Sequence, residues 1–168
     1  MLNTEELKSA LSDEIRIIRH LATKVDPAKL DWRPTEGQRS TKELLRYLAL
    51  VGIGPVKAML AGDWAVIGGM DEKLEGMGLE GFDAAMESQE RELHADVDGL
   101  GDSGLVEREG KMPWGDSLPM GKAIFTTSLR FLCAYRMQLF LYIKQSGAHE
   151  LGTSNAWLGM DAPEQSAV

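Results

Sequence analysis

The sequence predicts an all-α fold, an antiparallel four-helix bundle with long crossover connections. Apolar residues recur at intervals of three and four in four separate stretches. These stretches begin and end at residues that favour helix termini, such as Asn, Ser, Pro and Gly. The connections are uneven, which is typical of bundles with a crossover. The 168 residues suit one domain, with a core over about 4–147 and a tail over 148–168.

The first helix is expected over 4–24. Asn3 and Glu6 form a capping box at its start, in which each side chain caps the other's backbone. Asp26-Pro27 ends it, because proline disfavours helical geometry in the residue before it. Its core stripe consists of Leu7, Leu11, Ile18, Leu21 and Val25.

The second helix is expected over 41–61, after a loop that ends at Gly37. Ser40 and Glu43 form a second capping box. Pro55 lacks a backbone donor, so a kink is expected there. The inner face of this helix consists of Leu44, Tyr47, Leu48 and Val51.

The third helix is expected over 82–97. A glycine-rich connection over 62–81 precedes it, with a short helical turn around 71–74. Gly99 and the glycines that follow are expected to end this helix. One face of it carries Phe82, Met86, Gln89, Leu93 and Val97.

The fourth helix is expected over 120–146, closed by Gly147. Before it, residues 105–120 are expected to form small strand pieces or a loose hairpin. The tail is expected to pack back onto the bundle, and its last few residues to be disordered. The tail residues expected to make this contact are Asn155, Trp157 and Leu158.

Net charge, cysteine content and hydropathy exclude several classes of function. The net charge is −8 and the pI about 4.9, and an acidic surface repels phosphate backbones, so no nucleic-acid partner is expected. The single cysteine, Cys133, excludes an intrachain disulfide and fits a reducing compartment. The start of the chain lacks the pattern of a signal peptide, and no apolar run is long enough for a bilayer. We therefore expect a cytoplasmic protein with no membrane partner.

One face of the fourth helix mixes aromatic, hydroxyl and amide groups. Phe131 and Tyr135 are four residues apart and therefore share a side of the helix. This pattern fits either ordinary core packing or the lining of a cavity between helices. The full face is Ile124, Ser128, Phe131, Tyr135, Gln138 and Tyr142.

Several of these segments resemble the DinB/YfiT-like superfamily of four-helix proteins over about 7–157. They are Trp32-Arg33-Pro34 with Gly37, the Ser40-capped second helix, and Arg136-x-Gln138 leading to Gly147. The resemblance implies a metal site between helices. In that family a His stands about where Tyr47 stands, and the last helix reads His-x-x-x-His-Arg-Gly-Gln, which falls on Phe131, Tyr135, Arg136 and Gln138.

The chain departs from that ligand set at all three His positions. Phe131 has no donor atom, and the phenols of Tyr47 and Tyr135 ionise only near pH 10. The three histidines, at 20, 94 and 149, are expected on the solvated surface. We therefore predict no metal and no cofactor. The candidate ligand-binding residues, at the positions the resemblance assigns to metal, are Tyr47, Phe131, Tyr135, Ser128 and Gln138.

The sequence also predicts the surroundings of three further residues. Cys133 lies about 200° around the helix from Phe131 and is expected to point away from the pocket. Glu14 falls within the core stripe of the first helix and is either a buried acid with a raised pKa or, as we expect, an edge residue that reaches water. Arg136 suits either a salt bridge to a neighbouring helix or a substrate contact.

Three functions follow. The first is metal-free binding of a small molecule in the aromatic, hydroxyl-bearing pocket. The second, implied by the resemblance, is a metal-dependent thiol S-transferase or isomerase. The third is a non-catalytic homodimer that associates through exposed apolar positions such as Ile53, Val56 and Leu60. Whether the protein is an enzyme stays open at this point.

Overall fold

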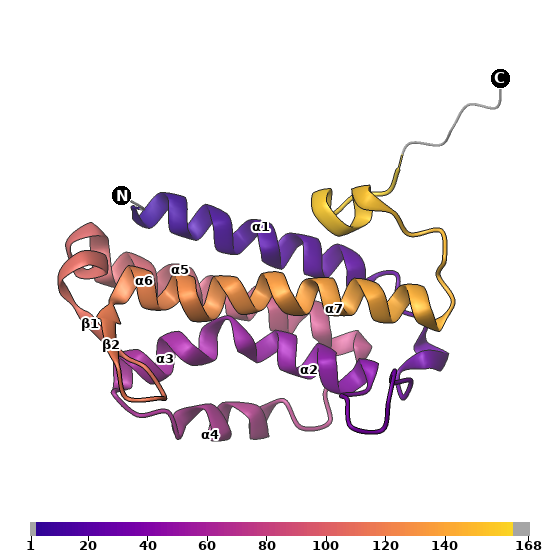
Figure 1. The fold of residues 1–168 in the computed structure, drawn as a ribbon, viewed down its shortest axis with the longest axis horizontal. Helices are drawn as coiled ribbons and strands as arrows, with labels where there is room; N and C mark the ends of the chain where they lie inside the picture. The colour runs from indigo at the N-terminus through magenta and orange to yellow at the C-terminus, as the bar shows by residue number, and fades with distance from the viewer. Residues whose placement is uncertain (1–2, 163–168) are drawn as a thin grey trace.

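The computed structural model describes residues 3–162, and its long helical segments lie side by side along one axis (Figure 1). The first and last segments run in one direction, and the two between them run in the other (Figure 1). The expected all-α bundle is confirmed. The segments are α1 (Thr4–Ala22), α2 (Thr41–Val51) with α3 (Ile53–Ala61), α5 (Leu79–Glu107), and α6 (Met120–Ile124) with the π-helical turn η2 (Phe125–Leu129) and α7 (Arg130–Ser146).

The long crossover joins the two middle segments. Because α2–α3 and α5 run in the same direction, the chain must return along the bundle between them (Figure 1). This return contains the helix α4 (Val66–Lys73), which packs against the outside of α2 and α3. The sequence predicted only a turn at 71–74. Despite its glycines, this stretch forms a helix of eight residues, and none of these residues is fully buried.

Both predicted capping boxes are present. Asn3 and Glu6 cap each other at the start of α1, and Ser40 and Glu43 do so at the start of α2. Past α1, Asp26 caps the short 3₁₀ turn η1 (Pro27–Lys29). These local signals fix where the helices begin because each satisfies backbone donors that a helix start leaves free.

The second helix breaks at Gly52, three residues before the expected kink at Pro55. The side chain of Gln89 on α5 inserts into the break. Its Oε1 accepts hydrogen bonds from the backbone N–H of Gly52 (2.9 Å) and of Ile53 (3.0 Å). Its Nε2 donates to the carbonyl of Leu48 (3.0 Å). These bonds replace the helical ladder, and α2 and α3 meet at a bend of 44°.

The third helix is longer than predicted. It does not end before Gly99 but continues to Glu107, with a single non-helical residue, Gly101 (φ 62°). Only glycine adopts this φ freely, so the chain kinks there and resumes its helix. The burial of Val97 and Leu105 on either side of the kink holds both halves against the bundle.

The expected hairpin is a two-stranded antiparallel ribbon. Its strands β1 (Glu109–Lys111) and β2 (Ser117–Pro119) pair with Gly110 opposite Leu118. The fourth segment then runs without a break through η2 to Ser146, and Gly147 (φ 143°) ends it as predicted. Because η2 lies one turn before Phe131, it sets the rotation of the last helix where the candidate site begins.

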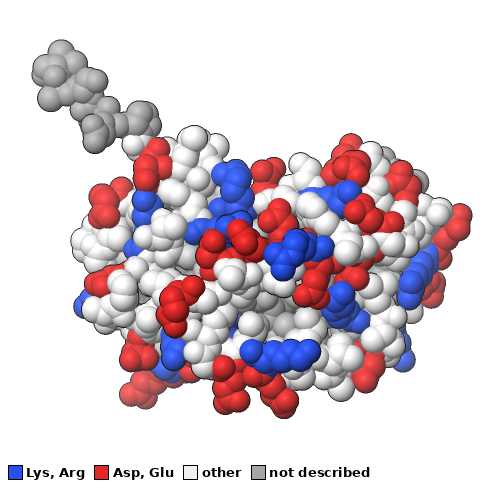
Figure 2. All heavy atoms as spheres, turned by 180° about the vertical axis from the view of Figure 1, so that it is seen from behind, with Lys and Arg blue, Asp and Glu red and all other residues white. Residues whose placement is uncertain are grey.

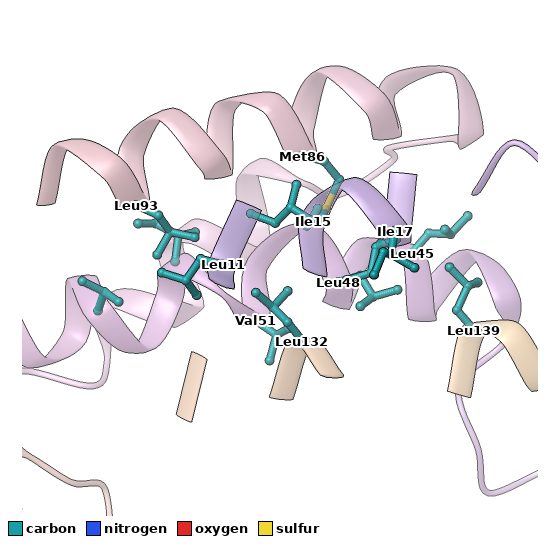
Figure 3. Packing of buried hydrophobic residues seen from close by; sticks show 14 of the residues in the cluster. Leu11, Ile15, Ile17, Leu45, Leu48, Val51, Met86, Leu93, Leu132 and Leu139 are labelled. Atoms are coloured by element: carbon teal, nitrogen blue, oxygen red, sulfur yellow. The ribbon is translucent and has the colours of Figure 1, made fainter. Parts of the chain in front are cut away.

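The core lies where α1, α2, α5 and α7 meet. Figure 3 shows aliphatic side chains of these helices pointing into one shared layer. The positions proposed for a dimer face belong to this core region, since Ile53 and Val56 are buried within the chain and Leu60 is half-buried. That dimer surface was therefore wrongly placed. The prediction assumed one continuous helix with an apolar repeat of 3.6 residues. The bend at Gly52 changes which side of the following helix faces solvent.

The C-terminal segment packs across α1 and α7 through the π-helical turn η3 (Ser154–Leu158). Asn155 is buried as expected, whereas the side chains of Trp157 and Leu158 stay largely exposed. The disorder expected for the last few residues falls on 163–168, outside the described residues.

Charged groups of both signs are interspersed over the face that α5 occupies (Figure 2). Many of them pair between helices, as Arg19 on α1 does with Asp83 and Glu87 on α5. Within residues 3–162, no single helix has the length and apolar composition needed to cross a membrane, although the bent pair α2 and α3 meets that test jointly.

Candidate functional site

Three of the predicted site residues form an aromatic cluster between α2 and α7. The Tyr47 ring contacts the Tyr135 ring edge-on, with centroids 4.7 Å apart. Phe131 lies one turn before Tyr135, and their rings meet edge-on at 6.5 Å. The four-residue spacing on α7 and the packing of α2 against α7 place the three rings together.

A cation covers this cluster. The guanidinium carbon of Arg39 lies 4.1 Å from the centre of the Tyr47 ring and 6.0 Å from that of Tyr135. Arg39 immediately precedes the Ser40 cap, and its carbonyl accepts a hydrogen bond from the Tyr142 hydroxyl (3.1 Å). Among residues 3–162 it makes no ion pair. No motif marked Arg39 in the sequence, because its stacking partner lies eight residues away on the next helix.

The electrostatics keep Tyr47 neutral. Burial, together with the neighbouring Tyr135 phenol, raises the pKa of Tyr47 to about 12, and the positive charge of Arg39 only partly offsets this. At physiological pH, Tyr47 therefore presents a phenol. It acts as a hydrogen-bond donor and an apolar surface rather than as an anion.

The other two candidate residues, Gln138 and Ser128, are not part of the aromatic cluster. The Gln138 side chain donates a hydrogen bond to the Tyr142 hydroxyl (2.8 Å), so it supports the loop at Arg39. Ser128 is fully buried on η2, and its hydroxyl has no hydrogen-bond partner within the described residues. The five residues thus divide into an aromatic cluster, a supporting amide and a core hydroxyl.

An open groove of about 600 Å³ runs beside Tyr47, between the loop before α2 and the helix α4. Arg39 and Arg46 line it, and Arg46 is held by an ion pair to Asp71 on α4 (2.8 Å). Gly68 exposes bare helix backbone to the groove, with nothing within 4 Å of where a Cβ would stand. Of the five predicted residues, Tyr47 is the one that lines this groove.

The residues at the positions assigned to metal by resemblance do not fit a metal ion. Phe131 offers no donor, and the raised pKa of Tyr47 opposes the phenolate that a metal would need. Among residues 3–162, no group of three or more His, Cys, Asp or Glu side chains is placed to hold a metal ion.

The prediction for Glu14 needs correction. Glu14 does not simply reach water but pairs with the buried Arg136, whose Nε lies 2.6 Å from its carboxylate. Their side chains are only 14% and 5% exposed. This settles Arg136 as a salt-bridge residue between α7 and α1. Cys133 lies beside this pair, and burial with the nearby Glu14 charge raises its pKa to about 11, which disfavours the nucleophilic thiolate.

Two of the three histidines are not solvated as expected. His20 is largely buried against Asn155 of the C-terminal segment, with its Nε2 3.1 Å from the Asn155 amide nitrogen, and burial lowers its pKa. His94 is half-buried, and its Nε2 lies 2.8 Å from the hydroxyl of Ser12. The sequence placed both on polar helix faces, but neighbouring elements cover those faces.

Comparison with known proteins identifies the fold. The structure resembles the crystal structure of a DinB-like protein, YjoA, from Bacillus subtilis, with a TM-score of 0.68. The similarity covers 88% of this chain and 95% of that one at 16% sequence identity. No family model matches the chain, and a search of curated proteins found no match. The fold is therefore DinB-like, and at this identity the similarity establishes the fold alone.

Proposed function

We propose that this DinB-like protein binds a small planar anion, without a metal, in the groove beside Tyr47 and Arg39. One observation carries the proposal. The Arg39 guanidinium is stacked on the Tyr47 ring, makes no ion pair among residues 3–162, and borders an open groove of about 600 Å³.

A stacked guanidinium suits a planar anion. Its face rests on the ring, while its N–H groups point outward in a fork that matches a carboxylate. Neutral Tyr47 adds apolar contact and one donor without repelling the anion. Tyr135 and Phe131 support the ring from behind, so little ordering accompanies binding.

This proposal favours binding over the S-transferase or isomerase chemistry that the sequence resemblance implies. That chemistry uses a metal to activate a thiol, and the side chains at 47, 131 and 135 do not suit a metal. The single thiol of the chain, Cys133, has a raised pKa and lies on the side of α7 that faces Glu14.

The test is calorimetric titration with benzoate and with benzyl alcohol, a neutral molecule of similar shape. We expect benzoate to bind and benzyl alcohol to bind at least tenfold more weakly, since a charge-assisted bidentate contact is worth about 1.5–3 kcal/mol. Arg39→Gln and Tyr47→Ala should each abolish the preference for benzoate.

A matched control is Arg130→Gln, which removes an exposed arginine of α7 that makes no ion pair among residues 3–162. It should leave benzoate binding unchanged. If benzoate does not bind the wild type at millimolar concentration, or binds equally to Arg39→Gln, the proposed anion site is wrong.

We also propose a cytoplasmic location, supported by the lone cysteine, and a homodimer in solution. Because Ile53 and Val56 are buried, the dimer would use exposed apolar side chains at the hairpin end of the bundle, such as Val106, Trp114 and Phe125. Sedimentation velocity of the wild type tests the dimer.

A further inference from the structure

A second hollow lies beneath α4 and adjoins the Tyr47 groove at Leu50, which lines both. It has a volume of about 410 Å³, within the usual range for small-molecule pockets, and α2, α3, α4 and α5 all contribute to its walls. It opens toward the face drawn in Figure 2, below the band of charged side chains on α5.

The walls of this hollow are mainly apolar. Its floor is the bend between α2 and α3, where Leu50 and Ile53 are already buried. Behind them, the amide of Gln89 forms hydrogen bonds with three backbone groups. These bonds fix the floor and leave the amide little capacity to bind a ligand. The opposite wall is the underside of α4, with Met70 and Leu74.

The helix α4 covers the hollow without filling it. None of its residues is fully buried, and Met70 and Leu74 remain half-exposed over the cavity. A helix of eight residues is not stable in isolation, so its contacts must hold it. One of these contacts is the ion pair of Asp71 with Arg46 on α2, on the groove side. An apolar ligand in the hollow would bury the rest of its underside.

The polar groups at the hollow indicate the ligand's charge. Lys57 is held between two carboxylates of α5, Asp96 (2.8 Å) and Glu92 (3.6 Å, also in the wall), so its charge is not available to a ligand. Lys73 at the end of α4 makes no ion pair within residues 3–162, and the half-buried Ser88 hydroxyl makes no hydrogen bond among them. A cation and a hydroxyl therefore remain available beside an apolar cavity.

We propose that the hollow beneath α4 is a second binding site, which takes an amphipathic monocarboxylic acid with an alkyl or aryl body. The body contacts Leu50, Ile53 and Met70, and the carboxylate lies at the mouth with Lys73 and Ser88. The proposal is independent of the Tyr47 groove, because it uses the other edge of α4.

The test follows the methyl group of Met70 by NMR in protein labelled at its methionine methyls, during titration with decanoate. We expect the Met70 signal, assigned with Met70→Leu, to shift and saturate. Decanol should bind several-fold more weakly than decanoate, and Lys73→Gln should weaken decanoate by about two- to fivefold, as expected for a partly exposed ion pair.

Two cavity-filling variants provide the decisive comparison. Ala85→Leu and Ser88→Leu each place a larger side chain into the hollow from α5, and we expect each to weaken decanoate binding at least tenfold. Their matched control is Ala84→Leu, the exposed neighbour on the same helix, which should bind as the wild type does. Circular dichroism establishes that every variant compared is folded.

The outcomes distinguish the two sites. Arg39→Gln should leave decanoate binding unchanged, since it alters only the Tyr47 groove. If decanoate leaves Met70 unshifted, or if both filled variants bind as the wild type does, the second site does not exist. Equal affinity for decanol and decanoate would overturn the assignment to acids.

Discussion

At the scale of single residues, the site depends on how Tyr47 is surrounded. Three features act on its phenol: burial between α2 and α7, the edge of Tyr135, and the guanidinium of Arg39. The first two outweigh the third and hold the proton on the oxygen, which raises the pKa to about 12. Tyr47 therefore presents a neutral side chain to the groove that it lines.

This environment predicts how stability responds to alkaline pH. The unfolded chain ionises Tyr47 near its ordinary value of 10.0, whereas the folded chain holds the proton to about 12. The contribution of neutral Tyr47 to the free energy of unfolding is therefore fully present below pH 10 and is lost as the pH rises toward 12. Tyr47→Phe should flatten this loss, measured by urea unfolding at pH 9 and pH 11. An equally steep loss in the variant would show that Tyr47 is not its source.

At the scale of elements, the bend between α2 and α3 depends on a partner that is distant in sequence. Pro55 removes one backbone donor, but the break lies at Gly52, where Gln89 binds the free backbone groups. A side chain on Gly52 would meet the Gln89 Oε1 at 2.8 Å, so glycine is needed for the amide to enter. The bend in turn forms the floor of the hollow beneath α4.

Gln89→Leu keeps the size of the side chain but leaves two backbone N–H groups and one carbonyl buried without partners. We expect a loss of about 3 kcal/mol in the free energy of unfolding, because each such group costs about 1–3 kcal/mol and local relaxation recovers part of this. Urea unfolding measures it. The control Gln145→Leu, on the exposed side of α7, should change stability by less than about 0.5 kcal/mol. Equal effects of the two variants would rule out the role given to Gln89.

At the scale of the whole molecule, Arg136 ties three distant parts of the chain together. It pairs with Glu14 on α1, donates to the carbonyl of Ala156 in the C-terminal segment, and stacks on the Trp157 ring at 4.9 Å. It therefore fixes the C-terminal segment against the bundle, and its role is structural.

Breaking this pair from one side should destabilise the protein strongly. Glu14→Ala leaves the Arg136 charge buried without a counter-charge, for which we expect a loss of about 3 kcal/mol in the free energy of unfolding. The double variant Glu14→Leu with Arg136→Met removes both charges and should be more stable than Glu14→Ala. The measurement is thermal unfolding of the wild type, of Glu14→Ala and of the double variant. A double variant that is less stable than Glu14→Ala would contradict this account.

Much of the fold could be predicted from the sequence because its signals are local. Caps at Asn3 and Ser40, the 3.6 period, and Gly147 act within one or two turns of chain, so they fixed the helices and the all-α class. The helical spacing of four, which is also local, predicted that Phe131 and Tyr135 share one face, whereas only the resemblance to the DinB/YfiT-like superfamily assigned Tyr47 to the same site. The length of α5 and the extent of α4 were missed, because packing overrides the glycines there.

Pairings between residues that lie far apart in the sequence could not be predicted, because they form only when the helices pack. Arg39 stacks on Tyr47, Gln89 opens the bend at Gly52, and Arg136 meets Glu14 across 122 positions. These contacts determine which polar groups are neutralised and which stay available to a ligand. The sequence alone was enough to predict a helical bundle, because propensity and periodicity are properties of neighbouring residues. The grooves on the two sides of α4 arise only when distant helices pack, as do the positions beside them of Arg39 and Lys73, which make no ion pair among residues 3–162.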